Sequence, residues 1–329
     1  MQNISNRLSA LRGGLRRLAF AALALTIASL GFTAGARADT LRVGKSVPVA
    51  FSFVPLDVGI QKGIFKKNGL DIKYFSFHGG GKEQQAMAAG SIDVGLGSGP
   101  AMGFIAKGAP VKAIAAMAGP PLLLVIIVRP DGPKTVADLK GKKISVSTRG
   151  SLTYWLTRET ARRQGWGPDG INAIPLGRTK GQIIAMEHGD TDGMVTDIAT
   201  ALTLEQQHKA RILVHFNDIH DFLMHVIFAT NDAIAKRPDD LRKFLKGWFE
   251  TIKYMRDHKA ETVKIAEPII HASPEITSKV YDQLMPMFLD DGHFPPKAMT
   301  VLSESYVTLG ILKKEPDPKT LYTEAFLPK

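Results

Sequence analysis

The sequence predicts an α/β fold of two similar lobes, each a mainly parallel sheet flanked by helices, joined by two crossover strands. The first observation is an internal repeat, because residues 86–93 and 185–192 share the pattern Ala-Met-x-x-Gly-x-x-Asp, and a short apolar run follows each. This pattern is typical of a helix that ends at a glycine, a tight turn, and a buried parallel strand. The second observation is that the same order of elements precedes both copies.

In the first copy we expect a strand over 41–47, a helix over 55–67 and a strand over 70–77. Gly69 marks the end of the helix, since glycine tolerates the left-handed conformation that commonly follows a helix. The repeat at 86–93 then supplies the next turn and strand. The first copy therefore predicts a βαβαβ unit, whose crossovers are right-handed.

The second copy predicts the same unit, with a strand over 143–147, a helix over 152–164 that Gly165 ends, and a short strand within 171–176. Buried runs at 122–128 and 224–229 are candidates for the two crossings. We therefore expect one lobe from residues 39–126 and 227–329 and a second lobe from residues 127–226.

The last third of the chain predicts helices. Apolar residues between 241 and 255 recur with a 3.6-residue spacing, and Pro238 suits the first helical position. The aromatic side chains of this stretch are expected in the core rather than in a ligand site. Further helices near 274–287 and 297–309 should pack against the first lobe.

The N-terminus predicts a secretory signal peptide. Residues 1–38 contain five arginines and no acid, an apolar stretch over 18–30, and an Ala-x-Ala pattern that ends at Ala38. This order is typical of a signal peptide, and the apolar stretch is short for a membrane span of about 20 residues. We expect cleavage after Ala38. Export of a chain without cysteine, and so without a lipid-attachment site, favours a soluble protein of a Gram-negative periplasm.

Composition excludes several functions. The chain has no Cys, which removes disulfides, thiolate metal sites and thiol catalysis. Its net charge of +11 includes five charges from the signal peptide, and no basic stripe with interleaved aromatic residues occurs, so we expect no nucleic-acid binding. We expect no cofactor and no bound metal. A group of His215, His220 and His225 is a weak metal candidate, because a spacing of five residues turns the side chains in different directions.

Loops at the carboxyl ends of the predicted strands are the candidate binding elements, since ligands of open parallel sheets bind there and helix N-termini point there. Each loop taken alone is ordinary turn and cap chemistry. Their occurrence at equivalent places in two lobes favours a binding site for a small anion or zwitterion. A glycine pattern at 97–103 is similar to a dinucleotide fingerprint, but no acid lies between residues 94 and 130 to bind a ribose.

Residues 62–72, Lys-Gly-Ile-Phe-Lys-Lys-Asn-Gly-Leu-Asp-Ile, resemble a signature of the ABC-transporter substrate-binding proteins for nitrate, aliphatic sulfonates, taurine and thiamine-pyrimidine precursors. The unit at 86–93, the strand at 111–117 and the segment 136–144 extend the likeness over most of residues 40–250. The resemblance implies a periplasmic-binding-protein type II fold, in which two lobes close on a ligand by hinge bending. It places the ligand contacts on the loops above, at Phe51, Ser52, Gly79, Gly80, Ser98, Thr148, Ser151, Tyr154 and Asp197.

The resemblance also implies a function and partners. We expect a monomeric periplasmic receptor that delivers a small organic ligand to an ABC permease and its ATPase in the inner membrane. Asp197 would repel a simple anion unless the ligand also carries an amine or Asp197 caps a helix, so a ligand with donor groups, such as an amino-sulfonate or a pyrimidine, is favoured over nitrate. Two alternatives stay open: an enzyme of pyrimidine or cofactor-precursor metabolism on the same fold, and a periplasmic ligand sensor.

Overall fold

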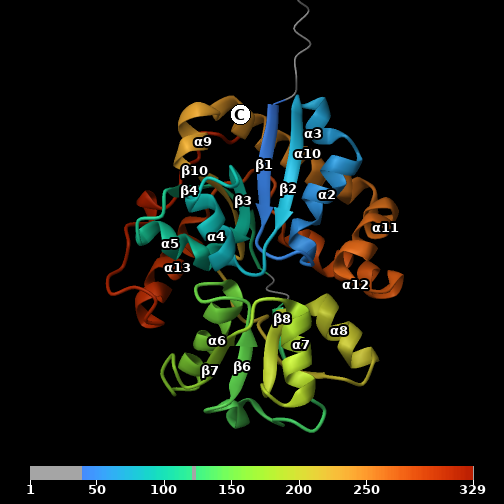
Figure 1. Ribbon diagram of the computed structural model, residues 1–329, viewed down its shortest axis with the longest axis vertical. Helices are drawn as coiled ribbons and strands as arrows, with labels where there is room; N and C mark the ends of the chain where they lie inside the picture. Colours follow the sequence, from blue (N-terminus) through green and yellow to red (C-terminus); the bar gives the residue numbers. More distant parts are fainter. Residues whose placement is uncertain (1–38, 121–123, 329) are drawn as a thin grey trace, which may run out of the picture. The chain divides into compact units, whose positions relative to one another are not determined.

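The computed structural model describes residues 39–120 and 124–328, so the predicted signal peptide lies outside the described residues. Asp39–Lys329 forms one compact unit. Its framework is two five-stranded sheets that have the same internal arrangement, which agrees with the repeat in the sequence. Figure 1 shows the strands of each sheet with helices packed on their faces.

The first sheet has the strand order β2-β1-β3-β10-β4. β1 pairs in parallel with both β2 and β3, whereas β10 runs antiparallel between β3 and β4. All six residues of β10, His-Val-Ile-Phe-Ala-Thr, are buried, as expected for a β-branched and aromatic run at the centre of a covered sheet. In chain order the strands are β1 (Asp39–Lys45), β2 (Leu70–Ser76), β3 (Val94–Ser98), β4 (Val111–Ala118) and β10 (His225–Thr230).

The second sheet repeats this plan with the order β7-β6-β8-β5-β9. β6 pairs in parallel with β7 and β8, and β5 runs antiparallel between β8 and β9. In each sheet the antiparallel strand, β10 or β5, is thus the first strand that the chain forms after it crosses from the other sheet. The strands are β5 (Leu124–Val128), β6 (Lys143–Val146), β7 (Asn172–Pro175), β8 (Gly193–Asp197) and β9 (Arg211–His215).

The helix expected over 55–67 is wrong as a single element. The chain forms the 3₁₀ turn η1 (Phe51–Phe53), then α2 (Val54–Gln61) and α3 (Ile64–Lys67). Gly63 separates the two helices because its φ of 67° is left-handed, a conformation that ends a helix and that glycine adopts without strain. The break allows Phe65 to turn inward and stack on Phe244, with ring centroids 5.3 Å apart.

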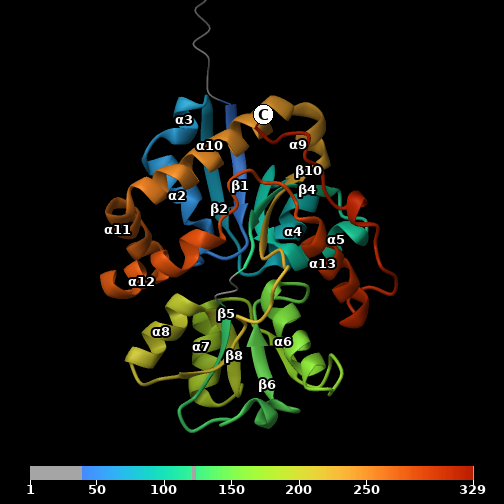
Figure 2. The same ribbon diagram turned by 180° about the vertical axis from the view of Figure 1, so that it is seen from behind.

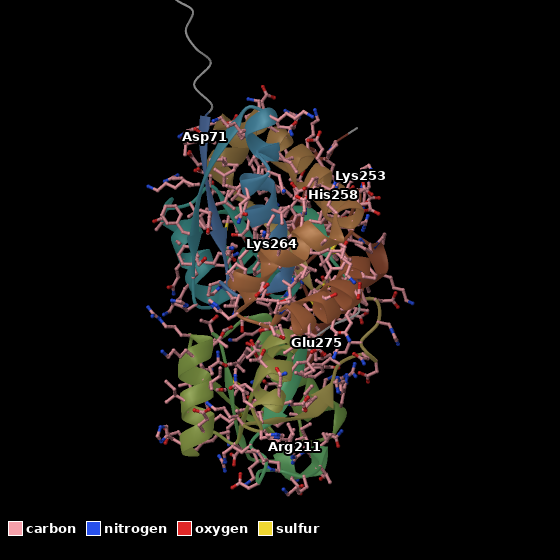
Figure 3. The ribbon with its side chains drawn as sticks, turned by 90° about the vertical axis from the view of Figure 1, so that its right-hand side faces the viewer. Asp71, Arg211, Lys253, His258, Lys264 and Glu275 are labelled. Carbon is pink, nitrogen blue, oxygen red and sulfur yellow. The ribbon has the colours of Figure 1, made fainter. Side chains whose placement is uncertain are left out.

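The remaining helices cover the two sheets. The long helix α10 (Pro238–Asp257) crosses over β1 and β2 in Figure 2. It packs mainly against α2 and α3, and its apolar residues are buried. Charged side chains such as Lys264 and Glu275 lie on the outer surface of the helices that follow (Figure 3). These elements are α4 (Gly80–Ala88), η2 (Gly99–Met102), α5 (Gly103–Ala106), η3 (Val136–Leu139), α6 (Leu152–Arg163), α7 (Thr179–His188), α8 (Ile198–Gln206), α9 (Asn231–Lys236), α10 (Pro238–Asp257), α11 (Lys259–Ile270), α12 (Pro274–Leu284), η4 (Met285–Met287), α13 (Pro296–Thr308) and η5 (Pro318–Thr320).

Two side chains of helix α6, beside the second sheet, form hydrogen bonds to α13 and the residue that follows it. The indole Nε1 of Trp155 donates to Ser305 Oγ at 2.9 Å, and Arg158 Nε donates to the Leu309 carbonyl at 2.7 Å. Both contacts are buried, so their loss would leave unpaired polar groups away from water. α12, expected to pack on the first lobe, contacts η1 and also α8 of the second sheet. Among the described residues no helix is long and apolar enough to span a membrane.

Candidate functional site

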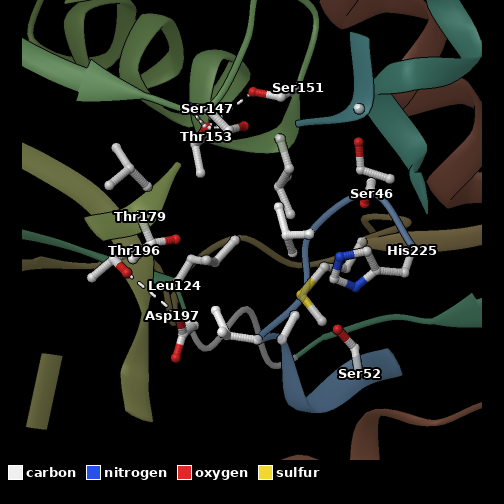
Figure 4. A pocket seen from close by; sticks show the side chains of 18 of the residues that line it. Ser46, Ser52, Leu124, Ser147, Ser151, Thr153, Thr179, Thr196, Asp197 and His225 are labelled. Carbon is white, nitrogen blue, oxygen red and sulfur yellow. Dashed lines mark hydrogen bonds between the residues drawn. The ribbon is translucent and has the colours of Figure 1, made fainter. Parts of the chain in front are cut away.

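A cavity of about 100 Å³ lies between elements of the two sheets. Its wall is mostly apolar and includes hydroxyls, one amide, one carboxylate and one imidazole, several of which Figure 4 shows. The lining residues are Ser46, Val47, Val49, Ala50, Phe51, Ser52, Gly80, Ser98, Leu124, Ser147, Ser151, Leu152, Thr153, Thr179, Gln182, Met194, Val195, Thr196, Asp197, Met224, His225, Leu284 and Met287.

Equivalent strand ends of the two sheets meet at this cavity. In the first sheet Ser98 ends β3 and lies opposite His225, the first residue of β10. In the second sheet Asp197 ends β8 and lies opposite Leu124, the first residue of β5. All four residues line the cavity, so the duplicated architecture places corresponding positions on the two sides of one space.

Three buried side chains of the cavity wall have a polar atom without a hydrogen-bond partner among the described residues: Ser98 Oγ, Gln182 Oε1 and His225 Nδ1. Each side chain is less than a tenth exposed. The Gln182 amide is oriented by its own nitrogen, which donates to the Gly177 carbonyl at 3.0 Å and leaves the oxygen free to accept. Buried polar groups are normally paired, so these three atoms mark where a ligand can bind.

His225 is a neutral imidazole at physiological pH. Burial disfavours its charged form and lowers its pKa to about 3. Its ring packs edge-on against Phe53 with centroids 4.9 Å apart, which fixes the ring plane. A neutral imidazole offers one donor and one acceptor, so His225 can accept as well as donate a hydrogen bond but attracts no anion as a charge.

Asp197 caps helix α8. One of its oxygens accepts the Thr200 backbone N–H at 3.0 Å and the other accepts the Thr200 hydroxyl at 2.8 Å. This is ordinary N-cap geometry, and it explains why a carboxylate occurs at the wall of the cavity. Burial raises the pKa of Asp197, and the hydrogen bonds from Thr200 only partly oppose that change.

The hydroxyls of the α6 N-terminus form a connected cluster, which Figure 4 shows. Ser151 caps the helix by accepting the Tyr154 backbone N–H at 3.2 Å, and its hydroxyl donates to the Thr148 carbonyl at 2.7 Å. Thr153 Oγ1 lies 3.2 Å from Ser147 Oγ and accepts the Ser147 backbone N–H at 3.0 Å. Because these hydroxyls already bond one another, they form a polar wall of fixed geometry.

No lysine or arginine is among the described residues that line the cavity. Lys45 directly precedes the lining residue Ser46, and its ammonium donates to Asp57 at 2.7 Å in a buried ion pair. The charge of Lys45 is therefore balanced within the protein. The cavity wall therefore offers neutral hydrogen-bonding groups and apolar surface, and no positive side chain of the described residues.

Of the site residues predicted from the sequence, six line the cavity: Phe51, Ser52, Gly80, Ser98, Ser151 and Asp197. The other three lie beside it. Thr148 Oγ1 accepts the Gly81 backbone N–H at 3.0 Å, a contact between loops of the two sheets, and the φ of 125° at Gly79 shapes the turn there. The Tyr154 hydroxyl bonds Arg158 at 3.2 Å on α6.

Sequence reasoning missed Ser46, Thr179 and Gln182, and did not propose His225 as a ligand contact. The repeat held a signal for two of them, since Thr179 and Gln182 occupy the positions of Gly80 and Glu83 in the first copy. Among the described residues no cluster of three or more His, Asp or Glu side chains could hold a metal ion. The histidine group therefore does not assemble a metal site in the part of the chain that the structure describes.

Residues 50–262 match the family model described as NMT1/THI5 like, which covers every strand of the two sheets except β1 and every cavity residue except Ser46, Val47, Val49, Leu284 and Met287. The chain belongs to this family. Among relatives of this NMT1/THI5-like protein, a chain of Brucella abortus named "Putative binding protein" is 24% identical over 94% of this chain and 98% of its own length.

Solved structures show the same fold. A Candida albicans gene product, described as having the generic periplasmic binding protein fold, superposes with a TM-score of 0.78 at 18% identity, covering 88% of this chain and 98% of that chain. The alkanesulfonate-binding protein SsuA from Xanthomonas axonopodis pv. citri, bound to MOPS, superposes with a TM-score of 0.72 at 17% identity, covering 85% and 95%. The NMT1/THI5-like chain therefore has a periplasmic binding protein fold.

Proposed function

We propose that the protein is the solute-binding component of an ABC importer and binds a small organic ligand in the cavity between its two sheets. The observation that carries this proposal is the set of unpaired buried atoms Ser98 Oγ, Gln182 Oε1 and His225 Nδ1 that line one cavity from both halves of the protein. Leaving such atoms unpaired costs roughly 1–3 kcal/mol each, a cost that a bound ligand offsets. The same atoms give the ligand its orientation.

The cavity bounds the size of the group it holds. An engineered cavity of about 150 Å³ accommodates benzene. A volume of about 100 Å³ therefore suits a head group of about four to six non-hydrogen atoms. The apolar parts of Phe51, Met194 and Met224 would cover its faces, and the hydroxyls and amide would bind its edges.

Ligand capture would involve hinge bending between the two sheets. The chain passes between them twice, before β5 and before β10, so a rotation needs backbone changes at only those two crossings. The hydrogen bond from Gly81 to Thr148 would form on closure, because it joins loops of opposite sheets. The closed form would then be the one that a permease recognises.

In this proposal the protein is exported to the periplasm. The arginine-rich, apolar N-terminus with its Ala-x-Ala exit supports secretion, and the relatives named as binding proteins support a receptor rather than an enzyme. A chain without cysteine also has no thiol for covalent catalysis. In this proposal the protein performs no chemistry and meets a permease and its ATPase at the inner membrane.

The test is calorimetric titration of the mature protein with taurine, alkanesulfonates, pyrimidines, aromatic acids and small amides, preceded by mass spectrometry of any ligand retained after purification. A ligand of this panel should bind with a stoichiometry of one, and Ser98→Ala should weaken it. Ser303→Ala is the matched control, because Ser303 is also buried with an unpaired hydroxyl but does not line the cavity. Turnover of a panel compound, or no binding by a folded protein, would contradict the proposal.

A further inference from the structure

A second cavity of about 480 Å³ adjoins the first, and the two share Val49 and Thr179 in their walls. Its chemistry is the reverse of the first. Five of its lining side chains are basic and, within the described residues, none is acidic. The basic side chains are His78, Arg178, Lys180, Lys209 and His271.

The positive charge of this outer cavity is neutralised only in part by neighbouring acids. Within the described ranges, Arg178 and Lys180 make no salt bridge, whereas Lys209 pairs with Glu187 at 3.0 Å. The pKa of His78 is lowered by burial first and then by the charges of Arg178 and Lys82 nearby. The cations Arg178 and Lys180 in the wall give the outer cavity a positive charge, which attracts anions.

The first turn of α7 divides its side chains between the two cavities. Thr179 and Gln182 line the inner cavity, whereas Arg178 and Lys180 line the outer one. One helical turn therefore presents an uncharged amide acceptor to the inside and two cations to the outside.

The inner cavity disfavours an anion. It holds the Asp197 carboxylate and the free acceptor Gln182 Oε1, its imidazole is uncharged, and no lysine or arginine of the described part of the chain lines it. A ligand carboxylate, sulfonate or phosphate placed there would lose its hydration without gaining a counter-charge, which is costly. A ligand N–H or O–H would instead satisfy the acceptors.

We propose, on the basis of the function proposed above, that the ligand is a two-part molecule: an uncharged, N–H-bearing head in the inner cavity and an anionic group in the outer cavity beside Arg178 and Lys180. The ligand class is therefore an amide-, carbamoyl- or heterocycle-headed acid. Compact sulfonates and nitrate do not meet this description, because they have no separate head to place against Gln182 and Asp197.

The experiment titrates the protein with matched pairs of ligands, in which each acid is compared with its own uncharged amide. The first pair is N-carbamoyl-β-alanine and its amide. Taurine and ethanesulfonate serve as compact sulfonates for comparison. The acid should bind at least tenfold more tightly than the amide at low salt, and added salt should reduce that difference. In Arg178→Gln/Lys180→Gln the difference should fall below about threefold. Lys107→Gln/Lys140→Gln, which removes two exposed cations outside both cavities, is the control and should keep it.

The outcomes separate the two proposals. Acids and amides that bind equally, a difference that persists in the Arg178/Lys180 double variant, or tighter binding of the compact sulfonates would overturn the two-part ligand and leave the receptor function standing. Failure of every acid and every amide of the panel to bind a folded protein would overturn both. A crystal structure of a bound acid with its anionic group against Asp197 would also overturn the inference.

Discussion

Ser98 and His225 lie opposite each other in neighbouring antiparallel strands, both buried and each with a polar atom that no described residue bonds. The pair stands where a strand end opens into the cavity. Their unpaired state lowers stability and provides binding capacity, and the two effects can be separated by mutation.

Ser98→Ala should leave the unliganded protein as stable as the wild type or more stable by about 1 kcal/mol, because it removes a buried hydroxyl without a partner. The same change should weaken the ligand about tenfold, since one hydrogen bond is lost. Denaturant unfolding and calorimetric titration measure the two effects. Ser303→Ala should match the first effect without the second, and equal weakening of the ligand by both variants would contradict a binding role for Ser98.

Acid should destabilise the protein through His225. Its folded pKa of about 3 lies below the unfolded value near 6.5, so the unfolded chain binds a proton first as pH falls. Stability should therefore decrease by up to about 1.4 kcal/mol per pH unit between about pH 6.5 and 3. Unfolding measured at several pH values should show a smaller slope in His225→Asn. An unchanged slope in that variant would show that His225 is not the group responsible.

Glu83 should lower the stability of the protein as pH rises, whereas His225 lowers it as pH falls. Its side chain is fully buried on α4 against Gly95 and Gly97, and burial raises its pKa well above the usual range, with a small opposing effect of the Leu96 backbone. A raised carboxyl pKa gives stability that is complete below the unfolded pKa and decreases as pH rises toward the folded pKa.

Glu83→Gln should accordingly remove part of the loss of stability that occurs as pH rises above about 4.3, the usual glutamate pKa. Unfolding free energies at pH 5 and pH 8 measure this loss. Glu304→Gln, at an exposed position of α13, is the control and should leave the pH dependence unchanged. A steeper loss in Glu83→Gln than in the wild type would contradict the prediction.

Gly79→Ala should impair closure. A Cβ at Gly79 would lie 2.4 Å from Thr148 Cγ2, and the φ of 125° disfavours any side chain. The loops of the two sheets would separate and the Gly81–Thr148 hydrogen bond would break. We expect weaker ligand binding and a larger radius of gyration by X-ray scattering in the presence of ligand. Gly181→Ala, where a Cβ meets no atom within 4 Å and the φ is ordinary, should have neither effect.

The repeat made the fold largely predictable. Both copies of Ala-Met-x-x-Gly-x-x-Asp form a helix, a left-handed glycine and a buried strand, with φ of 67° at Gly90 and 82° at Gly189. The helix break at Gly63 was not predicted, because glycine within an apolar helical pattern does not by itself distinguish a kink from a tolerated residue. The packing of Phe65 against Phe244, far along the chain, favours the break at Gly63.

The site was less predictable than the fold. Strand ends could be placed from the pattern, so Ser98 and Asp197 were anticipated, and both line the cavity. Side-chain direction decides which polar groups face the cavity and which cap a helix, and Asp197 does both. Gln182 and Glu83 occupy equivalent positions of the repeat and are both buried, yet Gln182 lines the cavity and Glu83 packs against glycines.

The equivalence of Ser98–His225 with Asp197–Leu124 has a consequence for how specificity can change. One half presents two polar side chains at its strand ends and the other an acid beside an apolar residue, although both descend from the same plan. A substitution at either strand end changes the groups that the protein offers on one side of the cavity, while the backbone of the other half is unchanged. A binding protein built this way can acquire a new ligand preference through mutations in a single half, and designers can vary the two halves separately.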